Sequence, residues 1–213
     1  MITIQHKRQI LSNILLIKLF IYSAFVMAGN LNIQVNDDQG KPLKDAVVYI
    51  ESNDLKDTNK KLQQDIVQKG KQFNPLVTVI QSGTSINFPN QDKVRHHVYS
   101  FSPAKKFELK LYSGVPAAPV LFDQAGTVVL GCNIHDRMLA YVYIVDTPLF
   151  AKSNQDGLAT LTNVPNGSLT INVWHYALRE EGVPVKQKVN LDANNQQLTV
   201  TLDINPASLV LSK

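Results

Sequence analysis

Short runs of β-branched and aromatic residues, separated by glycine-containing turns, are the feature that most restricts the fold of this sequence. Such runs occupy residues 46–50 (AVVYI), 76–80 (LVTVI) and 139–145 (LAYVYIV). Turn sequences of the Asp-Gly and Asn-Gly type recur between runs, as at residues 155–157 and 166–167. Short strands at regular spacing are typical of β-sandwiches, so we predict an all-β protein.

The only cysteine lies in a short segment that carries three potential metal ligands. Cys132 is followed by His135 and then by Met138, so a thiolate, an imidazole and a thioether are spaced three residues apart. Copper favours this combination of soft and borderline donors. The preceding residues 127–130 (TVVL) predict a strand. Cys132 should therefore lie at the inner end of a strand, with the two other donors on the turn that follows.

A blue copper centre needs a second imidazole in addition to the thiolate, the first imidazole and a weak axial thioether. The sequence supplies two neighbouring candidates, His96 and His97. Side chains alternate across a strand, so these two cannot both point at one metal ion. His96 shares a face with Val98. His97 shares a face with Tyr99, and periodicity alone therefore leaves the choice open.

The order of these residues, a histidine followed later by Cys-x2-His-x2-Met, resembles the ligand order of the cupredoxins over roughly residues 64–147. The short ligand loop is most similar to that of amicyanin, the copper protein that accepts electrons from methylamine dehydrogenase. The whole chain also resembles bacterial plastocyanin-like proteins known as methylamine utilization proteins. Residues 88–96 (FPNQDKVRH) are similar to the strand and turn before the first histidine ligand of the family. Carried over by position, the resemblance implies one type 1 copper ion with the ligands His96, Cys132, His135 and Met138.

Two further residues are expected from the resemblance to support this site without binding the metal. The family usually has asparagine after its first histidine ligand, and that asparagine joins two ligand loops by hydrogen bonds. His97 stands there in this chain, so we expect it to bond to the ligand loop. The alternative is an ordinary hydrogen-bonded strand histidine. Asn90, in the turn before the first ligand, is the second supporting residue, and Asp136 replaces a proline of the amicyanin loop.

The sequence on either side of the cupredoxin-like segment predicts a second sandwich. Residues 32–50 resemble the opening hairpin of carboxypeptidase-regulatory-like (transthyretin-like) domains. We expect a discontinuous module, residues 29–55 and 148–205, into which a cupredoxin-like Greek-key β-sandwich is inserted. The alternative is one merged sandwich with the N-terminal strands at its edge. Residues 53–63 predict a flexible connection, and residues 206–213 predict a frayed tail.

Trp174 and His175 lie at the end of a predicted strand of this second module. One interpretation is an electron relay or a second metal site. The interpretation that we favour is structural, with Trp174 as an anchor of the core and His175 at its rim.

Residues 1–28 have the pattern of a secretory signal peptide. Lys7 and Arg8 form a charged region, and an apolar stretch, residues 19–28, ends in a permitted cleavage sequence. Lys18 interrupts the apolar run, which favours cleavage over an uncleaved membrane anchor. We therefore expect export to the periplasm. In an exported protein an odd cysteine is a free thiol, an intermolecular disulfide or a metal ligand, and the neighbouring donors favour the third.

The charge of the mature chain favours neither of two classes of partner. The sequence has 21 basic and 17 acidic residues, but three of the basic residues lie in the expected leader, which leaves 18 against 17. Because the mature chain is nearly neutral, the basic pI of the whole sequence argues for neither nucleic acid nor an anionic membrane surface as a partner, and we expect no nucleic-acid binding.

No catalytic motif is visible in the sequence, which has no G-x-S-x-G, no phosphate-binding glycine loop and no H-E-x-x-H. Four protein ligands would leave no open position on the metal for a substrate. We therefore expect a one-electron carrier rather than an enzyme, one that docks weakly to a cytochrome or a dehydrogenase. The alternatives are a copper carrier or sensor with the same ligands, and a metal-free interaction module.

Overall fold

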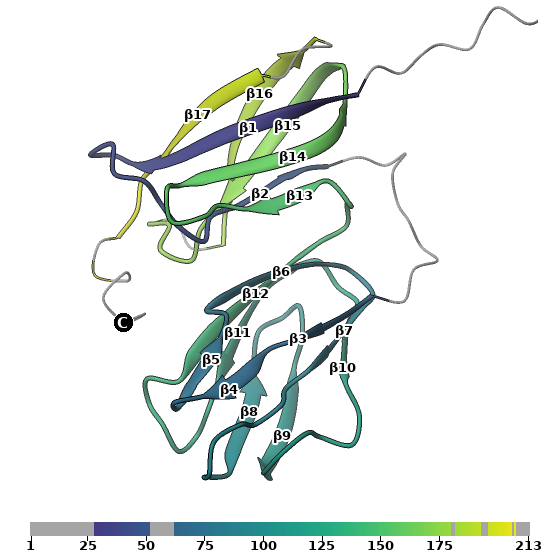
Figure 1. The fold of residues 1–213 in the computed structure, drawn as a ribbon, viewed down its shortest axis with the longest axis vertical. Coiled ribbons are helices and arrows are strands. Elements are labelled where there is room, and N and C mark those ends of the chain that lie inside the picture. Colours follow the sequence, from purple (N-terminus) through teal and green to yellow (C-terminus); the bar gives the residue numbers. More distant parts are fainter. Residues whose placement is uncertain (1–27, 52–61, 180–181, 193–195, 206, 208–213) are drawn as a thin grey trace, which may run out of the picture.

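The computed structural model describes residues 28–51, 62–179, 182–192, 196–205 and 207 (Figure 1). The predicted leader up to residue 27, and most of the predicted connection and tail, lie outside the described residues. In the described part of the chain, every regular secondary-structure element longer than one residue is a strand. No helix there is long and apolar enough to span a membrane. The prediction of an all-β protein is confirmed.

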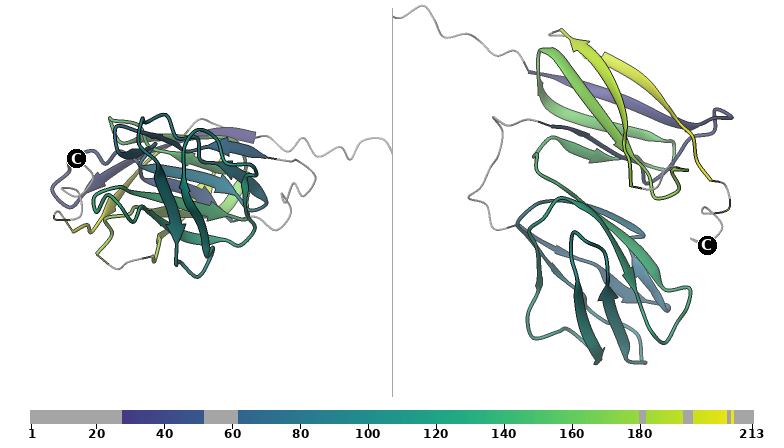
Figure 2. Two further views of the ribbon diagram at one scale, coloured as in Figure 1. Left: turned by 90° about the horizontal axis from the view of Figure 1, so that it is seen from below. Right: turned by 180° about the vertical axis from the view of Figure 1, so that it is seen from behind.

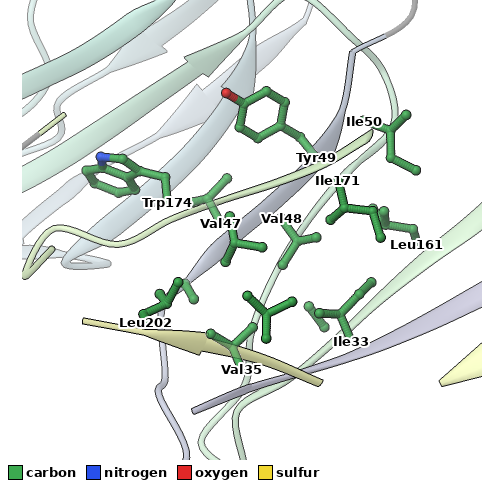
Figure 3. Close-up of a cluster of buried hydrophobic side chains, with 14 of the residues drawn as sticks. Ile33, Val35, Val47, Val48, Tyr49, Ile50, Leu161, Ile171, Trp174 and Leu202 are labelled. Carbon is green, nitrogen blue, oxygen red and sulfur yellow. The ribbon is translucent and has the colours of Figure 1, made fainter. Parts of the chain in front are cut away.

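One sandwich, here called the terminal sandwich, is built from strands near both ends of the described chain. Its strands are β1 (Ala28–Asp37), β2 (Val47–Ile50), β13 (Phe150–Lys152), β14 (Leu158–Pro165), β15 (Gly167–Trp174), β16 (Val185–Leu191) and β17 (Gln196–Leu202). One sheet has the order β14–β1–β17, with β1 and β17 parallel, and the other has the order β13–β2–β15–β16. Figure 3 shows the core between these sheets, where Ile33 and Val35 approach Val48 and Ile171, all fully buried.

The central sandwich is formed by the strands in between. They are β3 (Gln63–Asp65), β4 (Val67–Lys69), β5 (Gln72–Asn74), β6 (Val77–Gln81), β7 (Thr84–Asn87), β8 (His96–Ser100), β9 (Phe107–Tyr112), β10 (Val120–Phe122), β11 (Gly126–Gly131) and β12 (Leu139–Val145). Its sheets have the orders β6–β12–β11–β8–β9 and β10–β7–β3, and β4 pairs with β5 in a hairpin. The strand predicted at residues 127–130 is β11, and its Val128 and Leu130 are fully buried beside Cys132.

Strand β12 joins the two sandwiches, which lie one beyond the other along the long axis of the molecule (Figures 1 and 2). Ala140 and Val142 are buried in the central core, whereas the alternating Tyr143 packs in the terminal core. The Tyr143 ring stacks on Trp174 with 4.5 Å between ring centroids, and its hydroxyl lies 3.2 Å from that of Tyr49. The strand that follows the candidate ligand loop is therefore held from both sides.

His175 is buried, in contrast to its predicted place at the rim of the core, because main-chain groups hold both of its ring nitrogens. Its Nε2 donates to the Lys44 carbonyl at 3.0 Å, and the Ala177 N–H donates to its Nδ1 at 3.1 Å. Nδ1 therefore carries no proton and the ring is neutral. Burial is the main cause that lowers the pKa of His175 below its usual 6.5.

We expect the protein to lose stability as the pH falls through about 6.5, with His175 contributing part of the loss. The unfolded chain takes up a proton on this residue near that pH, whereas the folded protein resists protonation to a lower pH. His175→Gln should therefore flatten the pH dependence of the free energy of unfolding between about pH 7 and pH 5. Urea unfolding at a series of pH values measures this, and an unchanged slope in the variant would contradict a neutral buried His175.

Candidate metal centre

Strands β8 and β11 and the loop after β11 bring three donor side chains together at one end of the central sandwich. The Sγ atom of Cys132 lies 3.9 Å from Nδ1 of His96 and 3.9 Å from Nδ1 of His135. The three donor atoms all lie within 4.8 Å of one another. The two imidazole rings are 5.0 Å apart between centroids. Residues that are far apart in the sequence thus form one cluster.

The loop after β11 is made of two successive turns. The His135 N–H bonds to the Cys132 carbonyl at 3.4 Å, and the Met138 N–H bonds to the His135 carbonyl at 2.9 Å. Cys132 and Met138 are buried in the central core, whereas His135 is only half-buried. The loop therefore directs the thiol and the thioether inward and leaves the imidazole of His135 at the rim.

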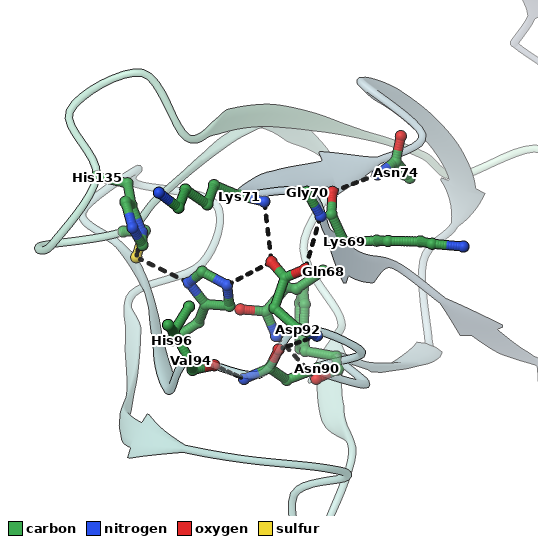
Figure 4. A network of polar contacts seen from close by, with 12 residues as sticks. Gln68, Lys69, Gly70, Lys71, Asn74, Asn90, Asp92, Val94, His96 and His135 are labelled. Carbon is green, nitrogen blue, oxygen red and sulfur yellow. Dashed lines mark hydrogen bonds and ion pairs between the residues drawn. The ribbon is translucent and has the colours of Figure 1, made fainter.

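Asp92 holds His96 in the orientation that turns Nδ1 toward the cysteine. Its Oδ2 accepts a hydrogen bond from His96 Nε2 at 2.8 Å. The same carboxylate accepts the N–H groups of Gly70 at 2.7 Å and of Lys71 at 2.9 Å, at the turn between β4 and β5 (Figure 4). The Lys71 N–H, followed by His96, lowers the pKa of Asp92 to about 2. An ionised acceptor keeps the His96 proton on Nε2 and leaves the Nδ1 lone pair available to a metal.

Asn90, one of the two predicted supporting residues, fixes the turn that carries Asp92. Its side-chain amide donates to the carbonyls of Val94 at 2.9 Å and Tyr112 at 3.0 Å. Its Oδ1 accepts the Asp92 N–H at 2.9 Å. Asn90 therefore acts on His96 through Asp92. Asp92 is not among the predicted site residues, although a carboxylate four residues before a candidate ligand is a signal that points to it.

His97 is the other predicted supporting residue. It bonds to a residue of β9, whereas we predicted a bond to the ligand loop. Its Nε2 lies 2.8 Å from Glu108 Oε1. Glu108 lies opposite Tyr99 in the pairing of β8 with β9, and Tyr99 and His97 lie on the same face of the sheet. This pairing brings the Glu108 carboxylate within hydrogen-bonding distance of His97. His97 Nδ1 is buried and has no hydrogen-bond partner among the described residues. The ring and two residues of the ligand loop, Asn133 and Ile134, line one depression of about 340 Å³.

The donor set fits a copper ion. Burial, followed by the electrostatic effect of the neighbouring His96 and Lys71, lowers the pKa of His135 below 6.5, so His135 is unprotonated at neutral pH, as metal binding requires. Figure 4 shows the Lys71 side chain extending toward the ring of His135. Two imidazole nitrogens and one cysteine sulfur form a mixture of soft and borderline donors that copper prefers.

No model of a known protein family matches the chain, and no curated protein matches it. Similar solved structures include a purple cupredoxin from Nitrosopumilus maritimus, which is 20% identical with a TM-score of 0.35 over 38% of this chain and 99% of that one. A proline-to-phenylalanine mutant of amicyanin in its reduced state is 16% identical, with a TM-score of 0.35 over 46% of this chain and 98% of its own. A copper-containing nitrite reductase from Thermus scotoductus is 22% identical, with a TM-score of 0.38 over 40% of this chain and 23% of the reductase chain. Each TM-score lies below 0.5, so the similarity assigns no function.

Asp92→Asn should weaken binding of Cu(II) about 10- to 100-fold, because a neutral amide no longer fixes the proton and the ring orientation of His96. Competition titration against a chelator of known affinity measures the effect. Asp136→Asn is the matched control, since it neutralises an exposed carboxylate beside His135. Equal affinities of the two variants would show that Asp92 does not orient the ligand.

Proposed function

We propose that the protein is a type 1 copper protein that carries single electrons between partner proteins. The observation that carries this proposal is the convergence of the donor atoms of His96, Cys132 and His135 within 4.8 Å. Bound copper would supply a one-electron couple. Met138, buried under the same loop, is the proposed weak axial ligand.

The surrounding residues suit electron transfer because they keep the donors in place. His96 is fully buried and is held by an ionised carboxylate, which is itself bonded to the β4–β5 hairpin. Cys132 follows directly on β11, a central strand of its sheet. A donor set that does not rearrange lowers the cost of gaining and losing an electron. Two of the three donors, His96 and Cys132, are buried, which favours retention of copper over its delivery to an acceptor, the rival function.

The half-buried His135 provides the proposed contact with a redox partner. Two exposed apolar side chains, Ile134 and Leu111, line the depression next to the ligand loop, together with Lys110. A small apolar surface of this kind suits brief docking of a cytochrome or a dehydrogenase. The proposal includes no catalytic activity of the chain itself.

Two further parts of the proposal concern domains and location. We propose that the central sandwich is a cupredoxin domain, residues 64–147, inserted into a carboxypeptidase-regulatory-like module of residues 29–55 and 148–205. We also propose that residues 1–28 direct the chain to the periplasm and are removed. Sequencing of the N-terminus of the exported protein tests the second part, and a start at residue 29 is expected.

The protein should bind one Cu(II) and show an intense thiolate-to-copper absorption band. His96→Ala should abolish the band, because it removes a proposed ligand. His97→Ala is the matched control and should keep the band, because the His97 ring bonds to Glu108 and lies outside the donor cluster. Visible and electron paramagnetic resonance spectra of the copper-loaded variants measure both effects. A colourless wild-type protein, or loss of the band only in His97→Ala, would contradict the proposal.

Met138→Leu should keep copper and the absorption band but raise the reduction potential, because loss of an axial donor destabilises Cu(II) more than Cu(I). Met138→Gln should lower the potential, since an amide oxygen is a harder donor. Protein-film voltammetry of the three proteins compares the potentials. If Met138 only packs in the core, leucine is nearly isosteric and the potentials of the parent and Met138→Leu should be equal.

A further inference from the structure

A cleft between the two sandwiches lies beside the candidate metal loop. Its volume is about 890 Å³, which is within the range of small-molecule binding sites. Residues 70–76 of the central sandwich form one part of its lining, and residues 41–45 of the terminal sandwich form another. Arg137 of the ligand loop lines it too. The cleft thus connects the terminal sandwich with the surroundings of the metal site.

The lining of this cleft carries an excess of positive charge. Its cationic residues are Lys41, Lys44, Lys71, Arg137 and Lys152, and its carboxylates are Asp37 and Asp45. Asp45 is buried and already neutralised, because its carboxylate lies 2.8 Å from Lys152 Nζ and 3.6 Å from Lys44 Nζ. Asp37 accepts the main-chain N–H groups of its own turn.

Three cations of the lining remain without an ion pair among the described residues: Lys41, Lys71 and Arg137. They come from three separate segments, namely the β1–β2 connection, the β4–β5 turn and the ligand loop. Like charges gathered in one recess repel each other and focus a positive potential there. A bound anion would relieve this repulsion and gain charge-assisted hydrogen bonds.

We propose that this cleft binds a small multivalent anion that carries carboxylate or phosphate groups, held by Lys41, Lys71 and Arg137. The recess lies between two walls of the same chain, and its volume suits a small molecule better than a segment of another macromolecule. Figure 4 shows Lys71 extending from this region toward His135, so an anion that pairs with Lys71 changes the charge beside the metal site. This second consequence rests on the proposed copper function, whereas binding of the anion does not.

Isothermal titration calorimetry of the metal-free protein with citrate and with inorganic phosphate, at low ionic strength, tests the binding. We expect saturable binding at one site by at least one of the two anions. The anion with the lower dissociation constant shows whether the site prefers carboxylate or phosphate groups. Lys41→Gln, Lys71→Gln and Arg137→Gln should each weaken binding about tenfold, the effect of losing one charged hydrogen bond.

Lys188→Gln is the matched control, because it removes one positive charge from an exposed position on β16, outside the cleft lining. Equal weakening by the control would overturn the proposal in favour of general charge attraction. Binding of polyglutamate without binding of either small anion would overturn it in favour of an acidic macromolecule. Absence of saturable binding by all three would also overturn it.

Voltammetry of the copper-loaded protein tests the second consequence. Saturating anion should lower the reduction potential, because it neutralises positive charge near the site and so stabilises Cu(II). Lys71→Gln should remove most of this shift. A potential that does not move would overturn the coupling between cleft and metal. A protein that binds the anion but no copper would refute the proposed function and leave the anion site standing.

Discussion

Burial of β12 from both sides is the constraint on which the arrangement of the site depends. A strand buried on one face can slide or tilt over its single core, but alternate residues of β12 are fixed in two cores. Its partners on the same sheet are β6 and β11, so it is also held along both edges. The ligand loop spans the connection from β11 to β12, and its two ends are therefore fixed by packing as well as by hydrogen bonds.

The polar network at the other side of the site has a comparable role for His96. A fully buried imidazole needs partners for its nitrogens, and a lost partner costs about 1–3 kcal/mol. Asp92 meets this need with one oxygen and uses both oxygens to accept N–H groups of the β4–β5 turn. Because these donors favour the ionised form, the carboxylate stays charged and the tautomer of His96 is selected without a metal. The donor atoms are thus oriented before any ion binds.

The sequence predicted the strands and the donor residues better than the contacts between distant side chains. Local alternation identified the strand before Cys132, and the three-residue spacing pointed to His135, whose ring the structure places beside the cysteine. The role of Met138 as a ligand stays a prediction. Which side chain meets His97 depends on the register between β8 and β9, and Glu108 reaches it through that pairing. The burial of His175 likewise depends on the Lys44 carbonyl, more than a hundred residues away in sequence. Neither contact leaves a local pattern in the chain.

The terminal sandwich matters to the site because it is fixed in place by a polar contact as well as by aromatic packing. Lys152 of β13 donates to the Val77 carbonyl of β6 at 2.7 Å while it pairs with Asp45 at 2.8 Å. Burial of that carboxylate without its cation would be costly, so Lys152 stays beside Asp45, where its ammonium group also reaches the Val77 carbonyl of the other sandwich. The same ion pair neutralises the acidic group nearest to Lys44. Lys152 therefore links the two sandwiches and also neutralises a carboxylate of the cleft lining.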